Sequence, residues 1–336
     1  MSASATKQTD TDRPKQKAGA SAPGASRRQG QLGWWWAQAR AQPLAAIGLV
    51  IVVAWILIAI FAPVIAPYSY KQGDYILAAP SLQHPFGKDN FGRDVLSRVL
   101  YGSQTVLTLA VVSTVASLIC GTIIALFAGY YGGIVDELLM RISDAAMSLP
   151  AILLALLILA MMGPGNVGLF ISTVIVFSPV VARVVRSAVL PLSGREFIAA
   201  AKLRGERGPS IMLRELVPNL LGVLAVEGSV RVGYAIFLIA SLGFLGLGVQ
   251  PPTPDWGLMV SEGQQYVLQA PWMVIFPALA ISSLVMGINL VSDGVKQLVT
   301  ALDQRRGDTA PVDHDHAEEA SGTADSTGNG NISLSI

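Results

Sequence analysis

The chain has 336 residues, of which 52% are hydrophobic and only 13% are charged, and its mean hydropathy is positive. This composition excludes an ordinary soluble domain, and apolar runs long enough to cross a bilayer indicate a polytopic membrane protein. The formal net charge of +1 is uninformative as a total because the charges are segregated, and the single cysteine, Cys120, excludes an intrachain disulfide.

Residues 1–42 are rich in Ser, Ala, Gly, Gln, Lys and Arg, which predicts a disordered tail. This polar leader is too long for a secretory signal. Trp34, Trp35 and Trp36 are typical of the aromatic belt that precedes a membrane span. The last thirty or so residues have a similar polar composition and predict a second disordered tail.

Six apolar runs are predicted to cross the membrane, so both termini lie on one side. Basic residues in the N-terminal tail and near the last span, among them Lys296, place that side in the cytoplasm. We therefore expect a multi-pass membrane protein with both termini in the cytoplasm. The predicted spans are 44–65, 104–129, 146–162, 167–185, 220–249 and 272–291.

Residues 66–103 are expected to be external, with an amphipathic helix from Gly92 to Tyr101. This stretch holds Lys71, Lys88, Arg93 and Arg98, against the usual excess of basic residues on the cytoplasmic side. We keep the assignment because the inverted topology would expose the basic N-terminus to the outside.

These features predict an all-α polytopic membrane protein with six transmembrane helices and disordered tails. The expected parts are a cytoplasmic tail (1–42), a first transmembrane helix with an external segment (43–103), a core of five transmembrane helices (104–300) and a second tail (301–336).

The most informative stretch is the charged loop 195–218 between two apolar runs. Glu196 begins a short predicted helix of strong helix formers, and Gly205 stands where that helix should end. A second short helix is predicted over residues 210–216, and Pro218 marks the entry to the next span.

The spacing in this loop resembles the coupling loop of ABC-importer permeases, which contacts the partner ATPases. Two alanines of that motif match Ala200 and Ala201, and its glycine and proline match Gly205 and Pro218. The family's glutamate falls on Ala199, its isoleucine on Glu215 and its leucine on Val217. The resemblance implies ATPase-coupling residues, namely Glu196, Ala199, Ala200, Ala201, Gly205 and Pro218.

Glu227 and Arg231 are charged residues within a predicted span, four residues apart and therefore on one helical face. Charges inside a bilayer are costly, so such residues pair or line a wet cavity. Two interpretations stay open: residues of a translocation path, or a self-neutralising pair at a helix-packing interface.

Residues 244–257, Phe-Leu-Gly-Leu-Gly-Val-Gln-Pro-Pro-Thr-Pro-Asp-Trp-Gly, resemble the dipeptide/oligopeptide/nickel branch of these permeases. The stretches 84–94 and 289–294 resemble segments of the second permease subunit of that branch. Asp255 and Trp256 are accordingly expected in an external loop, and Asn289 and Asp293 join the candidate path residues. The branch usually has an acidic residue where this chain has Ile239.

Other motifs have simpler interpretations. Gly163 to Gly168 matches the dinucleotide fingerprint in letters but follows no strand, so it predicts an external turn. There is no Walker A sequence, so the chain must draw on partners for energy. His314 and His316 lie in the polar tail and predict no metal site.

The resemblance implies a type I ABC importer permease of a bacterial inner membrane, which carries di- or oligopeptides and is not itself an enzyme. It implies three kinds of protein partner: a second permease subunit, two ATPase subunits that bind ATP and Mg, and an extracytoplasmic solute-binding protein. This chain itself would contact membrane lipid and no nucleic acid. Nickel or another small solute is the alternative cargo. A secondary carrier driven by an ion gradient, with Glu227 as its proton-coupling group, is the alternative class.

Overall fold

The computed structural model describes residues 43–71, 73 and 75–308, without the side chains of 302–308. All regular elements in these residues are helical, and the only β-type pairings described are two isolated bridges, Gly73 with Arg93 and Lys88 with Asp94. The two expected tails, with Trp34–Trp36, His314 and His316, lie outside the described residues apart from 301–308.

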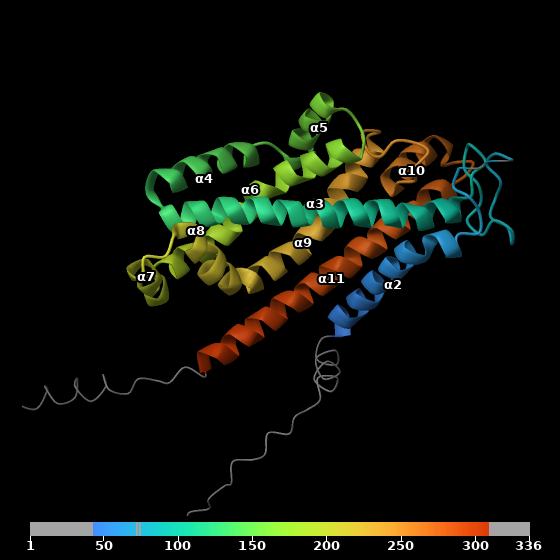
Figure 1. Ribbon diagram of the computed structural model, residues 1–336. Helices are drawn as coiled ribbons and strands as arrows, with labels where there is room; N and C mark the ends of the chain where they lie inside the picture. Colours follow the sequence, from blue (N-terminus) through green and yellow to red (C-terminus); the bar gives the residue numbers. More distant parts are fainter. Residues whose placement is uncertain (1–42, 72, 74, 309–336) are drawn as a thin grey trace, which may run out of the picture. The chain divides into compact units, whose positions relative to one another are not determined.

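Five helices are long and apolar enough to span a membrane, which confirms five of the six predicted spans. They lie side by side along one bundle (Figure 1). Their bounds are Pro43–Ile65 for α2, Val95–Tyr131 for α3, Asn166–Ser193 for α6, Val217–Phe244 for α9 and Trp272–Asp308 for α11. The last helix therefore runs beyond residue 300, where the second tail was expected to begin.

The third predicted span, 146–162, is broken. Gly133–Met147 (α4) and Ala151–Met162 (α5) meet at 90°, and only together are they long and apolar enough to cross a membrane. Pro150 lies at the break with an extended backbone, φ −54° and ψ 132°. Proline has no N–H to donate to a preceding turn, so the first helix stops and the second starts in a new direction.

Helix α3 corrects one prediction. The prediction of a separate amphipathic helix from Gly92 to Tyr101 is wrong, because α3 runs without a break from Val95 to Tyr131. Asp94 caps it, and its side chain accepts a hydrogen bond from the Ser97 N–H at 2.7 Å. The span that was predicted to start at residue 104 therefore starts earlier, because the polar residues up to residue 103 belong to the same helix.

Shorter elements occupy the two ends of the bundle. At one end lie α7 (Glu196–Leu203), α8 (Gly208–Ile211) and a single π-helical stretch, η1 (Met212–Leu216). At the other end lie α10 (Trp256–Gly263) and the 3₁₀ turn η2 (Gln264–Tyr266) (Figure 1). The predicted span 220–249 stops earlier, at Phe244, because Gly246 turns the chain with φ +78°.

Small residues let the long helices approach closely. A side chain at Gly48 of α2 would collide with Leu290 of α11, and one at Gly287 of α11 would collide with Ile51 of α2. On the opposite side of the bundle, Gly121 of α3 leaves space for Val181 of α6. The buried side chains form two apolar clusters, one toward the α10 end and one beneath α7.

Candidate functional site

Helix α7 has the local signals of a short but well-defined helix. Glu196 in its first turn and Lys202 in its last turn complement the helix dipole. Beyond Arg204, the Gly205 N–H donates to the Lys202 carbonyl at 3.0 Å and the Glu206 N–H to the Ala201 carbonyl at 3.2 Å. This pair of bonds closes the helix end and requires a left-handed residue, and Gly205 has φ +77°. The predicted helix end at Gly205 is confirmed.

The inner side of α7 is anchored to the bundle. Ile198 and Ala201 are completely buried in the apolar cluster that includes Val185 and Val189 of α6. The Lys202 ammonium lies 4.9 Å from the centre of the Tyr130 ring, near the end of α3. Movement of α7 is therefore coupled to the apolar cluster beneath it and, through Lys202 and Tyr130, to the end of α3.

The outer side of α7 is a narrow exposed stripe at helical spacing, made of Glu196, Ala199, Ala200 and Leu203. We call these four residues the outer face of α7. Leu203 is 89% exposed and was missed from the sequence, although its place four residues after Ala199 could have indicated it. Alanines flanking an exposed leucine offer a partner helix a close approach.

The predicted coupling residues therefore separate into three places. Glu196, Ala199 and Ala200 lie on the outer face, whereas Ala201 is buried on the inner side. Gly205 is exposed at the turn, and Pro218 is exposed at the start of α9. The structure does not bring all of them onto one surface.

The second predicted short helix is not a separate element. Residues from Gly208 onward run through α8 and η1 directly into α9. At η1 the Val217 N–H reaches back to the Met212 carbonyl, a wider turn than an α-helix makes. The wider turn relieves the clash that the Pro218 ring would otherwise make with the preceding turn. The chain after Gly205 is thus a continuous extension of the span.

Glu227 and Arg231 form an ion pair on α9, with Arg231 Nε 2.5 Å from Glu227 Oε1. Both side chains are largely buried. The guanidinium also lies 5.9 Å from the Phe177 ring of α6 and 5.4 Å from the Tyr234 ring. This geometry is that of a self-neutralising ion pair at the contact between α9 and α6. A role of Glu227 and Arg231 in a translocation path stays a prediction.

Asn289 and Asp293 occupy different surroundings. The Asn289 side chain packs against Gly233 of α9, where a Cβ would lie 3.2 Å from its oxygen. Asp293 is exposed and pairs with Lys296 of the same helix at 3.0 Å. The four candidate path residues therefore do not form one cluster.

Asp255 and Trp256 hold α10 against the bundle. The buried Trp256 indole N–H donates to the Val99 carbonyl at 2.9 Å, and its ring meets Trp55 edge-on at 4.9 Å. Asp255 caps α10 by accepting from the Leu258 N–H at 2.9 Å, while its Oδ2 has no hydrogen-bond partner among the described residues. Burial raises the pKa of the Asp255 carboxyl from 3.8 to about 6.

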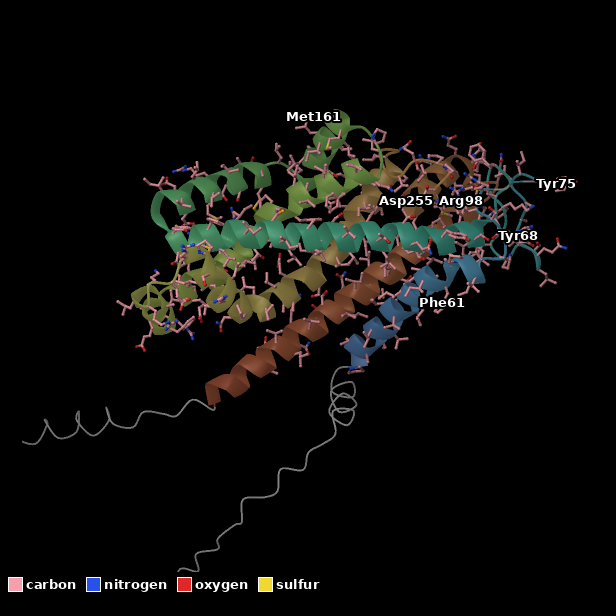
Figure 2. All side chains as sticks on the ribbon, viewed as in Figure 1. Phe61, Tyr68, Tyr75, Arg98, Met161 and Asp255 are labelled. Carbon is pink, nitrogen blue, oxygen red and sulfur yellow. The ribbon has the colours of Figure 1, made fainter. Side chains whose placement is uncertain are left out.

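A buried ionic network was missed from the sequence. Arg93 and Arg98 both contact Asp89, at 2.6 and 2.5 Å, and both contact Glu262 of α10, at 3.0 and 2.8 Å. Arg98 and Asp255 lie toward the same end of the bundle (Figure 2). Two of the basic residues that opposed the usual charge asymmetry are thus neutralised by carboxylates in the fold.

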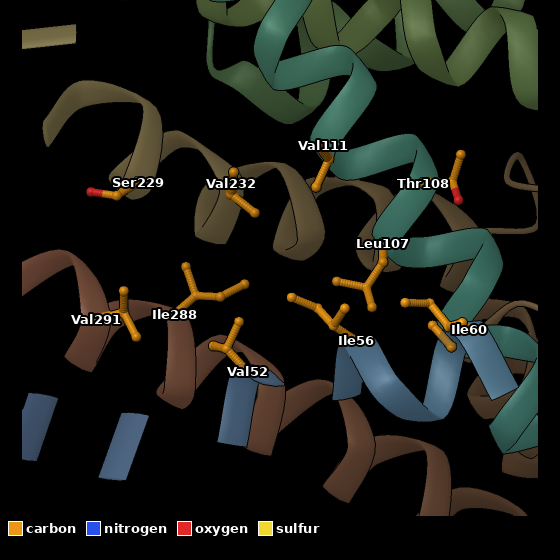
Figure 3. Close-up of a pocket in the computed structure, with 11 residues that line it drawn as sticks. Val52, Ile56, Ile60, Leu107, Thr108, Val111, Ser229, Val232, Ile288 and Val291 are labelled. Atoms are coloured by element: carbon orange, nitrogen blue, oxygen red, sulfur yellow. The ribbon is translucent and has the colours of Figure 1, made fainter. Parts of the chain in front are cut away.

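The apolar cavity drawn in Figure 3 has a different character. It measures about 420 Å³ and lies between α2, α3, α9 and α11, lined by residues such as Val52, Leu107, Val232 and Ile288. Its only polar side chains are Thr108 and Ser229. With no charged group in its lining, it offers nothing to the charged ends of a peptide. Within the described part of the chain, no group of three or more His, Cys, Asp or Glu could hold a metal ion.

Comparison with known families gives two matches. Residues 121–305 match the family described as "Binding-protein-dependent transport system inner membrane component". Residues 31–85 match the "N-terminal TM domain of oligopeptide transport permease C". The second match extends over α2 and most of the segment before α3.

Individual relatives cover most of the chain. A dipeptide transport system permease protein of Alkalihalophilus pseudofirmus is 41% identical over 77% of this chain and 86% of its own. A glutathione transport system permease protein of Escherichia coli is 40% identical over 78% of this chain and 87% of its own. Among solved structures, a chain of the inward-facing MetNI methionine ABC transporter aligns with 61% of this chain over 97% of its own length. The sequence identity is 19% and the TM-score is 0.49.

Proposed function

Because the chain belongs to the family of binding-protein-dependent transport system inner membrane components, we propose that it carries di- or oligopeptides across the membrane in an ATP-driven importer. As a member of this family it is a multi-pass transport component rather than an enzyme. Support for a peptide substrate comes from the relatives, one named for dipeptides and one for glutathione, which is itself a short peptide.

The single observation that carries the coupling proposal is the two-sided construction of α7. Its inner side is buried, through Ile198 and Ala201, in the apolar cluster that also holds side chains of α3 and α6, whereas its outer face presents two alanines and an exposed leucine to the surroundings. We assign the outer face, with Gly205, as the surface that a partner ATPase grips. Ala201 then acts from behind as an anchor, and Pro218 starts the span that receives the movement.

This assignment places the α7 end of the bundle, and both chain termini, in the cytoplasm. Two ATPase subunits would bind and hydrolyse ATP with Mg²⁺, since the sequence has no Walker A motif of its own. A second permease subunit would complete the path, and an extracytoplasmic binding protein would deliver the peptide. ATPase closure would move α7 as a rigid body together with the ends of α3 and α6.

For the path itself we propose Glu227, Arg231 and Asn289 at mid-bundle, with Asp293 nearer the end of α11. The Glu227–Arg231 pair is arranged to exchange partners with the charged ends of a peptide at little net cost, because each charge already has an opposite charge within reach. Asn289 lies against Gly233, two residues beyond Arg231, and is therefore close to the same level of α9.

The experiment that tests this function uses the complete importer in proteoliposomes with labelled peptide, ATP and the binding protein. Ala200→Trp fills the outer face with a bulky ring and should abolish ATP-dependent uptake while the complex still assembles. Ala145→Trp, at an exposed alanine of α4, is the matched control and should leave uptake near normal. Uptake driven by an ion gradient without ATPase subunits, or normal uptake by the Ala200 variant, would contradict the proposal.

A further inference from the structure

One side of α9 is left uncovered by the described residues. Tyr234 and Phe237 are each more than half exposed there, and Phe244 is also exposed. These aromatic residues follow one another at spacings of three and seven, which places them along one side of the helix. We call these three residues the aromatic stripe of α9. The opposite side of the helix carries Val232, which lines the apolar cavity (Figure 3).

The aromatic stripe lies between α6 and α11. On one flank, the Arg231 guanidinium lies 5.9 Å from the Phe177 ring of α6. On the other flank, Gly233 lies against the side chain of Asn289 of α11. Arg231 and Gly233 stand on either side of Tyr234 around the helix. Two of the candidate path residues, Arg231 and Asn289, therefore border the stripe from opposite sides.

Tyr234 lies at a depth that is unusual for a tyrosine exposed to lipid. It comes ten residues before the end of α9 at Phe244, or about 15 Å along the helix axis. This distance is half the thickness of a hydrocarbon core of about 30 Å. Tyrosines that face lipid gather at the membrane surfaces, where the hydroxyl reaches water, and the Arg231 charge suits hydrocarbon even less. The stripe is therefore expected to face a polar space rather than lipid tails.

The Arg231 guanidinium has a free edge beside this stripe. Among the described residues it donates only through Nε, to Glu227 Oε1 at 2.5 Å, so its two terminal nitrogens are left for a ligand. Neighbouring N–H groups of a guanidinium bind a carboxylate through two parallel hydrogen bonds. The Tyr234 ring lies 5.4 Å from the guanidinium and stabilises it there, and its hydroxyl adds a further donor.

We propose that Arg231 and Tyr234 together bind the C-terminal carboxylate of the peptide in transit, and that Phe237 contacts its last side chain. The proposal rests on the function proposed above and makes Tyr234 a specificity-determining residue, which distinguishes a free C-terminus from a blocked one. The carboxylate reaches the terminal nitrogens of Arg231 while Nε is still bonded to Glu227. The cation thus has an opposite charge beside it throughout.

The test follows a short peptide whose last side chain carries a photoreactive group. The peptide is made with a free C-terminal carboxylate and, separately, with a C-terminal amide, and each form is loaded on the binding protein to the same occupancy. The loaded binding protein is added to the complete importer in nanodiscs with a non-hydrolysable ATP analogue. After illumination, mass spectrometry locates and quantifies the labelled residues of α9.

In the wild type, the free acid should label the region of Phe237 roughly tenfold more than the amide does, as expected for hydrogen bonds to a charged group. Tyr234→Phe keeps the ring and removes only the hydroxyl, so it should lower labelling by the acid and leave labelling by the amide unchanged. Arg231→Lys keeps the charge but loses the two-pronged edge and should also remove the preference. Tyr75→Phe, at an exposed tyrosine outside the spans, is the matched control and should change neither value.

A tyrosine with a merely structural role would not distinguish the two peptides. Equal labelling of wild-type α9 by acid and amide would overturn the inference, even if peptide uptake is normal. Equal losses for both peptides in Tyr234→Phe, together with loss of the second permease subunit from the complex, would assign the stripe to a subunit contact and overturn it too. A wild-type importer that takes up no peptide with ATP would overturn the function proposed above, and this inference with it.

Discussion

The turn at Gly205 provides the sharpest test of the coupling assignment. Its φ of +77° costs a residue with a side chain about 1–2 kcal/mol. No heavy atom lies within 4 Å of the position that an alanine Cβ would take, so Gly205→Ala adds backbone strain and no collision. A cost of this size lowers the population of the closed turn by about 5- to 30-fold relative to its open forms. Gly205→Pro is more severe, because proline fixes φ near −65° and removes the N–H that donates to Lys202.

The assay compares peptide taken up with ATP hydrolysed in proteoliposomes. The ratio should fall from wild type to Gly205→Ala and further in Gly205→Pro, whereas Gly205→Asn should stay near wild type because asparagine tolerates this conformation. The unfolding temperature of the complex should change little, since Ile198 and Ala201 still anchor α7. Equal uptake per ATP in Gly205→Pro and wild type would show that the turn at Gly205 does not couple ATP hydrolysis to transport.

Three further predictions concern buried charges. Arg98→Met removes one of two cations from the ionic network and should destabilise the protein by about 3–5 kcal/mol in thermal unfolding, whereas Arg141→Met, at an exposed pair, should cost less than about 1 kcal/mol. The Asp255 pKa of about 6 exceeds its usual 3.8, so the folded state holds more protons between these values. The free energy of unfolding should therefore fall by about 3 kcal/mol as the pH rises from about 4 to 6 and stay level above that, and Asp255→Asn, which keeps the helix cap, should remove the slope. Glu227→Gln and Arg231→Gln should each impair uptake, whereas the double variant, which leaves neither charge unpaired, should lose little stability. Normal uptake by both single variants would remove the pair from the path.

Much of the fold follows from local features of the sequence. The long uncharged runs predicted the spans because a bilayer admits few alternatives to an apolar helix. Gly205 predicted the end of α7 because few other residues adopt a left-handed backbone without strain. Glu227 and Arg231 predicted their own ion pair because helical spacing places residues four apart on one face.

What the sequence could not provide depends on contacts between distant segments. Glu262 meets Arg93 and Arg98 across 169 and 164 residues, and no local pattern signals that pairing. Without it, the basic residues before and within α3 seemed to oppose the topology and suggested a separate surface helix. The continuation of α8 into α9 was missed for another reason: Pro218 normally interrupts a helix, and only the π-helical stretch before it accommodates the ring.

Helix α3 carries a mechanical consequence. Its 37 residues form an unbroken rod of about 55 Å, with Arg98 near one end and the tyrosines beneath α7 near the other. A tilt of about 10° around the midpoint would displace each tip by roughly 5 Å, close to one helical turn. Events on opposite sides of the lipid would then be linked through a single stiff element, and a proline in the middle of α3, which kinks the helix, should weaken that link.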